Sequence, residues 1–276
     1  MLTNMPPTLE FNRFVTTVEV VPPAGPDPER VLGELKSLQD LPFDGFSVAT
    51  NPVAKPRMNA MALCALIQKA TDRPSILHVT TRDHNILSLQ GLLWGASALG
   101  IKTVMVATGD FVALGQRATT TTVRDVDVFK LVRMAREAGM QTGVVFDPHP
   151  EIDGMDLAVE RLELKAEAGA EFAVTQPVYD EAAVQALSAS TRHIDIPIIL
   201  GILPLRTSRH AEFLHTRVDG ITVPNHVRDR MQRATDPVAE GASNAREILA
   251  LAHEHFAGAC LMPPFDHYEV MFDILI

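Results

Sequence analysis

Cysteine is scarce in this chain of 276 residues, which has only two. Cys64 lies in a helical pattern and Cys260 in an apolar run. Two cysteines alone can build neither a disulfide framework nor a zinc site, so we expect both in the core.

Long apolar runs are absent as well. No run approaches the roughly 18 residues that a membrane-spanning helix needs. Residues 1–14 have neither the basic start followed by an apolar core nor the cleavage pattern of a secretory signal. We therefore expect a cytoplasmic protein without a membrane partner.

Positive charge is in deficit, with 24 Lys and Arg against 34 Asp and Glu and a net charge of −10. The sequence has no Lys/Arg-rich block, and a chain of this charge repels a polyphosphate backbone. Nucleic acid is thereby excluded as an expected partner. The hydrophobic content of 46% is enough for one large core in a single domain.

Short β-branched or apolar runs alternate with longer segments of helical period. This alternation is typical of βα units with a parallel sheet. Eight strands are predicted, at residues 16–21, 45–49, 75–79, 103–107, 143–146, 172–175, 198–202 and 259–262. Helices are predicted at residues 28–38, 60–70, 85–99, 126–138, 157–168, 181–188, 209–215 and 238–255.

These elements predict a single (βα)8 TIM barrel over residues 1–276, with a helical excursion around 224–256 before the last strand. Residues 220–224 are a candidate for a further short strand. A doubly wound sheet is the rival architecture, but no G-x-G-x-x-G follows the first strand, where a dinucleotide fold needs it.

Polar residues recur where the predicted strands end, which is where parallel α/β enzymes keep their chemistry. The most informative case is the sequence ATGD at 107–110, in which an apolar run delivers Asp110 to a turn that Gly109 permits. The other strand-end residues are Glu19, His78, Asp147, His149 and Gln176.

Taken alone, each of these residues has an ordinary structural explanation. Glu19 is then a solvated carboxylate, Asp110 caps the following turn and Gln176 is a turn residue. Asp147, His149 and Glu151 suggest a metal, but their spacing is not that of a ligand set, so no metal is predicted.

Taken together, several motifs resemble the methylenetetrahydrofolate reductases, a family of flavin-dependent (βα)8 barrels. The resemblance runs nearly end to end. The motifs are VEVVPP at 18–23, SV at 47–48, HVT at 78–80, TGD at 108–110, KAEAGA at 165–170, TQPVYD at 175–180 and GILP at 201–204. HVTTRDHN at 78–85, LPLRTSRHAEF at 203–213 and PPFDHY at 263–268 are similar to the variety fused behind a homocysteine methyltransferase.

The resemblance implies an oxidoreductase that interconverts 5,10-methylenetetrahydrofolate and 5-methyltetrahydrofolate through bound FAD, with NADH or NADPH as electron donor. It also implies a functional link to a methyltransferase. Glu19 matches the family's acid, which protonates the departing nitrogen as the folate ring opens. The folate is expected to contact Asp110, Gln176, Tyr179 and Leu203, with Asp110 between flavin and pterin.

The same resemblance implies residues that bind the flavin. They are His78, Thr108, Gly109, Asp110, Asp147, His149, Arg161 and Lys165. Arg161 and Lys165 stand four residues apart on a predicted helix, so both can face one diphosphate. The best-known members have an arginine in place of Thr108 and a tyrosine in place of Thr50. Arg82 or Arg124 would then hold the adenine end instead.

Three alternatives stay open. One is a flavin-independent reductase acting on the same folate, and another is a methyltransferase module in which Asn51 or Asn225 joins Asp110 at the pterin. A folate-binding subunit without catalysis is the third. Separately, the apolar helix at 87–99 is consistent with a homo-oligomer or with a helix that faces the barrel interior.

Overall fold

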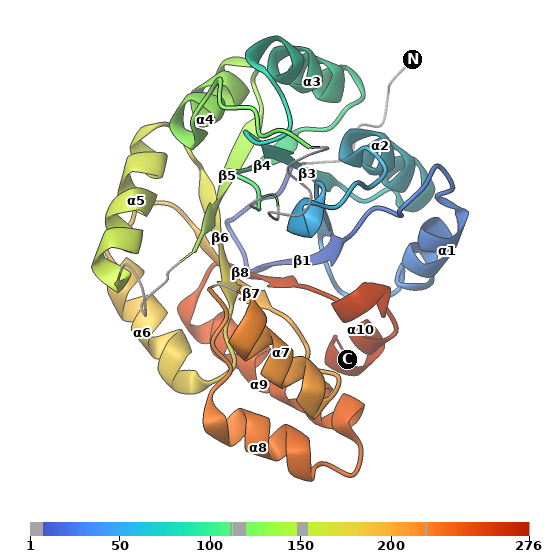
Figure 1. Cartoon of the computed structure of the whole chain (residues 1–276), viewed down its shortest axis with the longest axis vertical. Helices are drawn as coiled ribbons and strands as arrows, with labels where there is room; N and C mark the ends of the chain where they lie inside the picture. Colours follow the sequence, from blue (N-terminus) through green and yellow to red (C-terminus); the bar gives the residue numbers. More distant parts are fainter. Residues whose placement is uncertain (1–7, 111, 113–119, 148–153, 219, 276) are drawn as a thin grey trace.

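The computed structural model describes residues 8–110, 112, 120–147, 154–218 and 220–275. Eight parallel strands close into a barrel in the order in which they occur along the chain (Figure 1). The strands are β1 (Val15–Val20), β2 (Gly45–Val48), β3 (Ser75–Thr80), β4 (Thr103–Ala107), β5 (Gln141–Phe146), β6 (Phe172–Pro177), β7 (Ile198–Ile202) and β8 (Gly258–Leu261). The predicted (βα)8 barrel is confirmed, and this fold places the carboxyl ends of all eight strands at one mouth.

Helices surround the barrel (Figure 1). They are α1 (Glu29–Ser37), α2 (Ala60–Thr71), α3 (Ile86–Ala98), α4 (Val128–Glu137), α5 (Met155–Glu167), α6 (Glu181–Thr191), α7 (Ser208–Arg217), α8 (Asn225–Arg233), α9 (Pro237–His255) and α10 (Val270–Ile274). Two short 3-10 turns, η1 (Pro52–Ala54) and η3 (Pro264–Asp266), lie in the loops after β2 and β8. None of the helices in the described part of the chain is long and apolar enough to cross a membrane.

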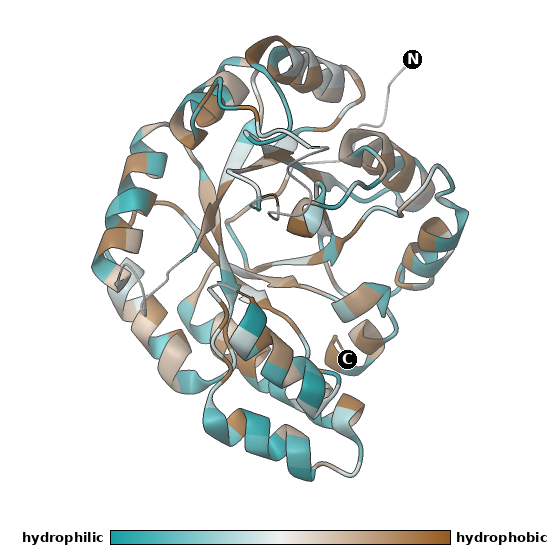
Figure 2. Ribbon diagram, viewed as in Figure 1, coloured by the Kyte–Doolittle hydropathy of each residue, from teal (hydrophilic) through white to brown (hydrophobic). Residues whose placement is uncertain are grey.

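Successive side chains of each strand alternate between the barrel interior and the layer beneath the helices, which separates two cores. Figure 2 shows both brown and teal segments on the surrounding helices, with α8 mostly teal. Val18 and Val20 point outward into the layer between strands and helices. Val15 belongs instead to a smaller cluster with Ile76 and Cys260, which fills the barrel interior. Interior positions therefore follow one parity along each strand, and this parity decides which side chains reach the mouth.

Side-chain caps fix the start of several outer helices. The side chains of Asn85, Asp127 and Asp180 accept backbone N–H groups at the first turns of α3, α4 and α6. Residues 220–224 form no strand. Instead, the apolar Ile221 and Val223 pack in a separate cluster with residues of α7 and α8.

Candidate active site at the barrel mouth

Three polar residues have interior parity at the carboxyl ends of their strands. Glu19 pairs in register with Ser47 on the neighbouring strand. Both share the interior parity of Val15 and Gly45, and His78 on β3 shares that of Ile76. Gln176 lies at the end of β6, where the pairing with β7 shifts register between Val174 and Pro177, so strand parity does not determine the side that its amide faces. Residues predicted from separate strand ends thus come together at the top of one barrel.

Glu19 is partly buried among apolar neighbours on β1. Loss of hydration raises the pKa of its carboxyl from 4.5 to about 7, and the negative charge of Asp110 contributes to the same shift. A carboxyl group with this pKa is half protonated near neutral pH. It can therefore act as a general acid under physiological conditions.

His78 lies in the interior layer on β3, which pairs with β2, and it is neutral. Burial lowers the pKa of its imidazole to about 4. Its Nε2 is 2.7 Å from the Ser47 hydroxyl, and the Thr50 hydroxyl donates to its backbone carbonyl. The ring is thus held in one orientation and offers hydrogen bonds without charge.

Asp110 follows β4 on a turn that requires glycine. Gly109 has φ +88°, and a Cβ there would lie 3.1 Å from Cβ of Thr80. The Asp110 carboxylate accepts the backbone N–H of Val53 from the loop after β2. Val53 itself adopts φ 50°, which is unusual for a β-branched residue and is typical of strained positions near functional sites.

Arg82 joins three loops around Asp110. Its side chain is only 4% exposed, and it donates to the Asp83 carboxylate from Nε at 2.6 Å and from Nη2 at 2.7 Å. It also donates to the backbone carbonyls of Asn51 at 3.1 Å and Asp110 at 3.0 Å. These four bonds use most of its five donors, so Arg82 supports the mouth more than it offers charge to a ligand.

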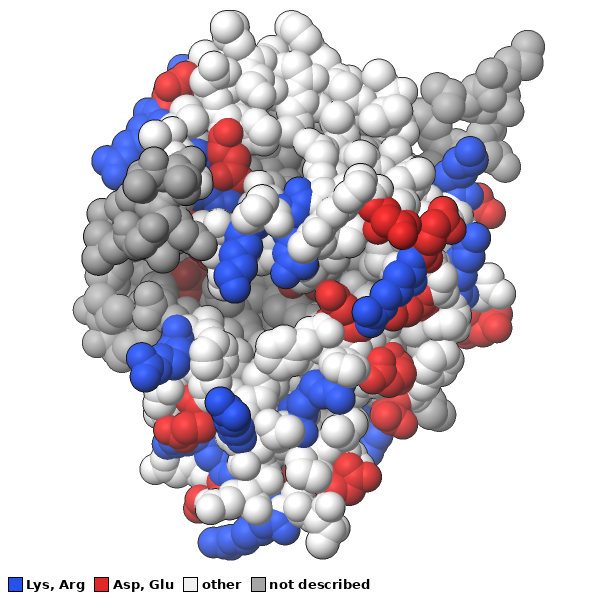
Figure 3. All heavy atoms as spheres, turned by 45° about the vertical axis from the view of Figure 1, so that its right-hand side comes forward, with Lys and Arg blue, Asp and Glu red and all other residues white. Residues whose placement is uncertain are grey.

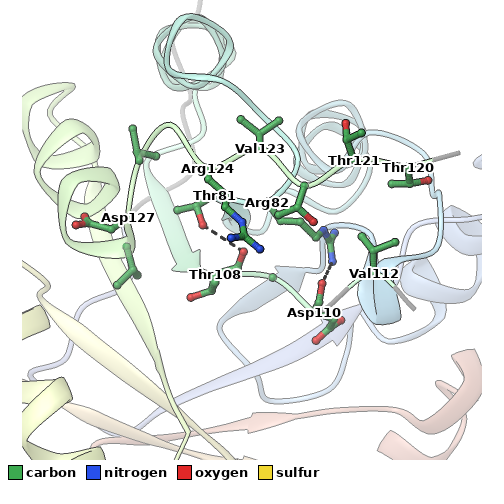
Figure 4. A pocket seen from close by; sticks show the side chains of 14 residues that line it. Thr81, Arg82, Thr108, Asp110, Val112, Thr120, Thr121, Val123, Arg124 and Asp127 are labelled. Atoms are coloured by element: carbon green, nitrogen blue, oxygen red, sulfur yellow. Dashed lines mark hydrogen bonds between the residues drawn. The ribbon is translucent and has the colours of Figure 1, made fainter. Parts of the chain in front are cut away.

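A pocket of about 700 Å³ opens beside this turn, over the ends of β3 and β4. Its lining is rich in hydroxyl groups, from Thr81, Thr108, Thr120, Thr121 and Thr122. Figure 4 shows the guanidinium groups of Arg82 and Arg124 directed into it. The exposed Arg124 supplies a cation, while Asp110 and Asp127 add carboxylates to the same lining, so the pocket offers a polyhydroxylated ligand groups of both charges.

A second group of predicted residues gathers where β5 meets α5. Lys165 reaches from α5 and donates through Nζ to the carbonyl of Val145 at 2.7 Å. Burial lowers the pKa of its ammonium and the nearby Arg161 lowers it further, while Asp147 acts in the opposite direction. Asp147 and Arg161 therefore both lie within electrostatic reach of Lys165. His149 lies outside the described residues.

Tyr179 and Leu203 occupy different surroundings from the other predicted residues. Tyr179 is 2% exposed and packs in the apolar cluster formed with residues of α7 and α8. Leu203 is partly buried and packs against this cluster. Burial strongly raises the pKa of the Tyr179 phenol, and its backbone carbonyl accepts from Asn244 at 3.0 Å. The structure thus places the Tyr179 ring in a core and not at the mouth.

Some neighbours of the site carry little sequence signal. Asp83 holds Arg82 through a carboxylate just after β3, and its neighbour Thr80 donates to the same group at 3.3 Å. The sequence indicated this segment by its position at a strand end and by the HVTTRDHN motif, but neither predicts the ion pair. Cys260 lies close to Glu19, whose charge helps to raise the pKa of its thiol to about 12, after burial as the larger cause.

The raised pKa of Glu19 predicts a stability that depends on pH. The Glu19 carboxyl binds its proton more tightly in the folded state than in the unfolded state. The resulting contribution to the free energy of unfolding is fully present below pH 4.5 and is lost as pH rises through about 7. Ionisation of Glu19 in the folded protein lowers the free energy of unfolding by about 3 kcal/mol. Glu19→Gln should therefore gain stability over the wild type between pH 5 and pH 8.5, as measured by urea unfolding.

The matched control is Glu29→Gln at an exposed position of α1, which also removes one negative charge. A constant difference between Glu19→Gln and the wild type across this pH range would contradict the shifted pKa.

The fold and this site define a (βα)8 barrel whose ionisable groups meet at the carboxyl ends of the strands. A family model described as methylenetetrahydrofolate reductase matches residues 5–253. The chain belongs to the methylenetetrahydrofolate reductase family.

Individual relatives agree. The chain is 27% identical over 196 residues to "Methylenetetrahydrofolate reductase 2" of Saccharomyces cerevisiae, covering 67% of this chain and 32% of that protein. It is 24% identical over 162 residues to a Caenorhabditis elegans protein named "Probable methylenetetrahydrofolate reductase (NADPH)", covering 57% of this chain and 24% of that protein. The chain thus matches a third or less of the length of these relatives.

The fold is also similar to that of a solved Clostridium thermocellum protein described as binding two copies of 5-methyl-5,6,7,8-tetrahydrofolic acid. The TM-score is 0.68 at 14% identity, with 95% of this chain and 94% of that chain covered. At this identity the likeness concerns the fold.

Proposed function

We propose that the protein interconverts 5,10-methylenetetrahydrofolate and 5-methyltetrahydrofolate by hydride transfer through bound FAD, with NADH or NADPH as electron donor. The observation that carries this proposal is Glu19, a carboxyl with a pKa of about 7 in the interior layer of a reductase-family barrel. The reaction needs an acid at neutral pH, because the methylene group is locked in a ring that opens only when its nitrogen is protonated.

The residues at the mouth fit a flavin nucleotide. The pocket after β4 has the volume of a ligand site, and its threonine hydroxyls and Arg124 suit a ribose and a phosphate. Lys165 and Arg161 supply further positive charge beside β5. Bound FAD would supply the hydride, which no side chain of the protein can provide.

The polar residues of the mouth suit the pterin of the folate. The Asp110 carboxylate can accept the amino group and ring N–H of the pterin edge together, in addition to the N–H of Val53. The half-buried amide of Gln176 presents both a donor and an acceptor. Glu19 then delivers its proton to the departing nitrogen from the floor of the same mouth.

An absorbance titration tests the proposal. Purified protein with FAD should show a bound flavin spectrum that bleaches with NADH or NADPH without oxygen and returns when methylenetetrahydrofolate is added. A protein that reduces the folate without any flavin spectrum would be a flavin-independent reductase. One that binds 5-methyltetrahydrofolate but reduces nothing would favour the methyltransferase alternative.

Asp110→Asn should weaken folate binding by roughly 10-fold, because one charge-assisted pair to the pterin becomes neutral. It should also lower the pKa of Glu19, since the Asp110 charge is one of the two causes that raise it. Folate titration and the pH profile of folate reduction measure the two effects. An unchanged affinity together with an unchanged profile would remove Asp110 from the site.

A further inference from the structure

Two exposed apolar side chains lie in loops at the carboxyl ends of strands. The other large apolar residues that are exposed in the described part of the chain lie on the surrounding helices or at the end of α3. Val53 in η1 is 64% exposed and Phe265 in η3 is 69% exposed. The ring of Phe265 lies 4.9 Å from that of His210, whereas Val53 packs in none of the three apolar clusters. The isopropyl group of Val53 is therefore open to solvent.

The backbone at Val53 is strained as well as exposed. Its φ of 50° and ψ of 31° are left-handed, a conformation that β-branched residues rarely adopt. Such strain persists where surrounding contacts impose it, and Asn51 supplies those contacts here. The Asn51 side chain accepts the backbone N–H of Arg57 at 2.9 Å and donates to Asp83 at 3.1 Å. Arg82 donates to the Asn51 carbonyl, also at 3.1 Å. The fold thus holds an exposed valine in an unfavourable conformation, which is typical of a functional position.

The strained turn places Val53 against Asp110. The backbone N–H of Val53 donates to Oδ2 of the Asp110 carboxylate. A carboxylate has about four acceptor positions, so Asp110 can bind a second donor while it holds this one. The negative charge of Asp110 also acts on Glu19. Val53 therefore lies next to whatever ring Asp110 binds, at the end of the mouth where Glu19 is placed.

We infer that Val53 is a ligand-contact residue whose isopropyl group packs on the flat ring that Asp110 binds, which under the proposed function is the pterin of the folate. Charged and uncharged side chains both border the hollow near the centre of the molecule (Figure 3). A ring that meets a carboxylate with its edge still presents apolar surface to water. An aliphatic group beside that carboxylate covers part of this surface and gains the free energy of its burial. The inference rests on the proposed function and adds an apolar contact to it.

Val53→Asn tests the strain and the contact together. Asparagine tolerates a left-handed backbone but removes the isopropyl group. Without ligand, the thermal midpoint of the variant should lie roughly 2 °C above that of the wild type, because the strain is relieved. In calorimetric titration with 5-methyltetrahydrofolate in the presence of FAD, its affinity should be lower by roughly 5- to 10-fold. A residue that only supports the loop would not lose affinity while the protein gains stability.

Two further variants serve as controls. Val53→Ile keeps a β-branched apolar side chain and should bind 5-methyltetrahydrofolate as the wild type does. Asp72→Asn introduces the same amide at another left-handed position, with φ 55°, at the C-cap of α2. Because this cap precedes β3, it lies at the end of the barrel opposite the mouth. Asp72→Asn should therefore leave the folate affinity unchanged.

The outcomes separate this inference from the proposed function. An unchanged folate affinity in Val53→Asn would overturn the inference alone. A loss of stability together with affinity would also overturn it, because Val53 would then act by supporting the loop. A wild type that binds no 5-methyltetrahydrofolate would overturn the proposed function and this inference together.

Discussion

Glu19→Gln is expected to slow reduction of methylenetetrahydrofolate by about 10²- to 10⁴-fold, the range that a positioned general acid contributes. Glutamine preserves the shape of the side chain at the end of β1 but carries no proton with a pKa near 7. Reduction of the flavin by the nicotinamide needs no such proton. We therefore expect that half-reaction to stay within a factor of about two of the wild-type rate.

Stopped-flow measurement of the two half-reactions separates these effects. The wild-type rate of folate reduction should fall as pH rises above about 7, because the acid form of Glu19 is depleted. The Glu19→Gln profile should lose this dependence, and Glu19→Asp should retain it at a lower rate. An equal loss in both half-reactions would indicate that Glu19 organises the pocket and does not transfer the proton.

The barrel was predictable because its strands are short apolar runs separated by helical patterns. The predicted limits of β4 and β7 match the structure at both ends, and the other strands differ by at most two residues at either end. Residues 220–224 were the ambiguous case. Their alternating Ile221 and Val223 satisfy a strand pattern, but these side chains pack beneath α7 and α8. Periodicity alone does not tell which of two cores receives an apolar residue.

The site was predictable to the extent that strand ends determine it. Glu19 and His78 lie at the same mouth because parallel strands deliver their interior residues to it. The contacts of Arg82 depend on loops instead, such as the left-handed turn at Asn51, whose carbonyl lies 31 positions away in the sequence. Tyr179 follows the end of β6, where the chain leaves the barrel, so its strand parity no longer applied.

The mouth also depends on close packing of α9, which makes Gly241 a critical position. A Cβ at Gly241 would lie 1.7 Å from the carbonyl oxygen of Leu205, in the loop that follows β7 and carries Leu203. Backbone on both sides resists displacement, so Gly241→Ala must push α9 or this loop away. We expect a loss of about 3 kcal/mol, at the upper end of overpacking costs.

Gly33→Ala in α1 is the matched control, because a Cβ there meets nothing within 4 Å. Alanine is the better helix former by about 1 kcal/mol, so the same substitution should stabilise α1. In thermal unfolding, the midpoint of Gly241→Ala should lie roughly 6 to 12 °C below that of the wild type. The midpoint of Gly33→Ala should lie roughly 2 to 4 °C above it. A gain of stability in both variants would contradict close packing of α9 against the loop that carries Leu205. Other contacts would then hold that loop at the mouth.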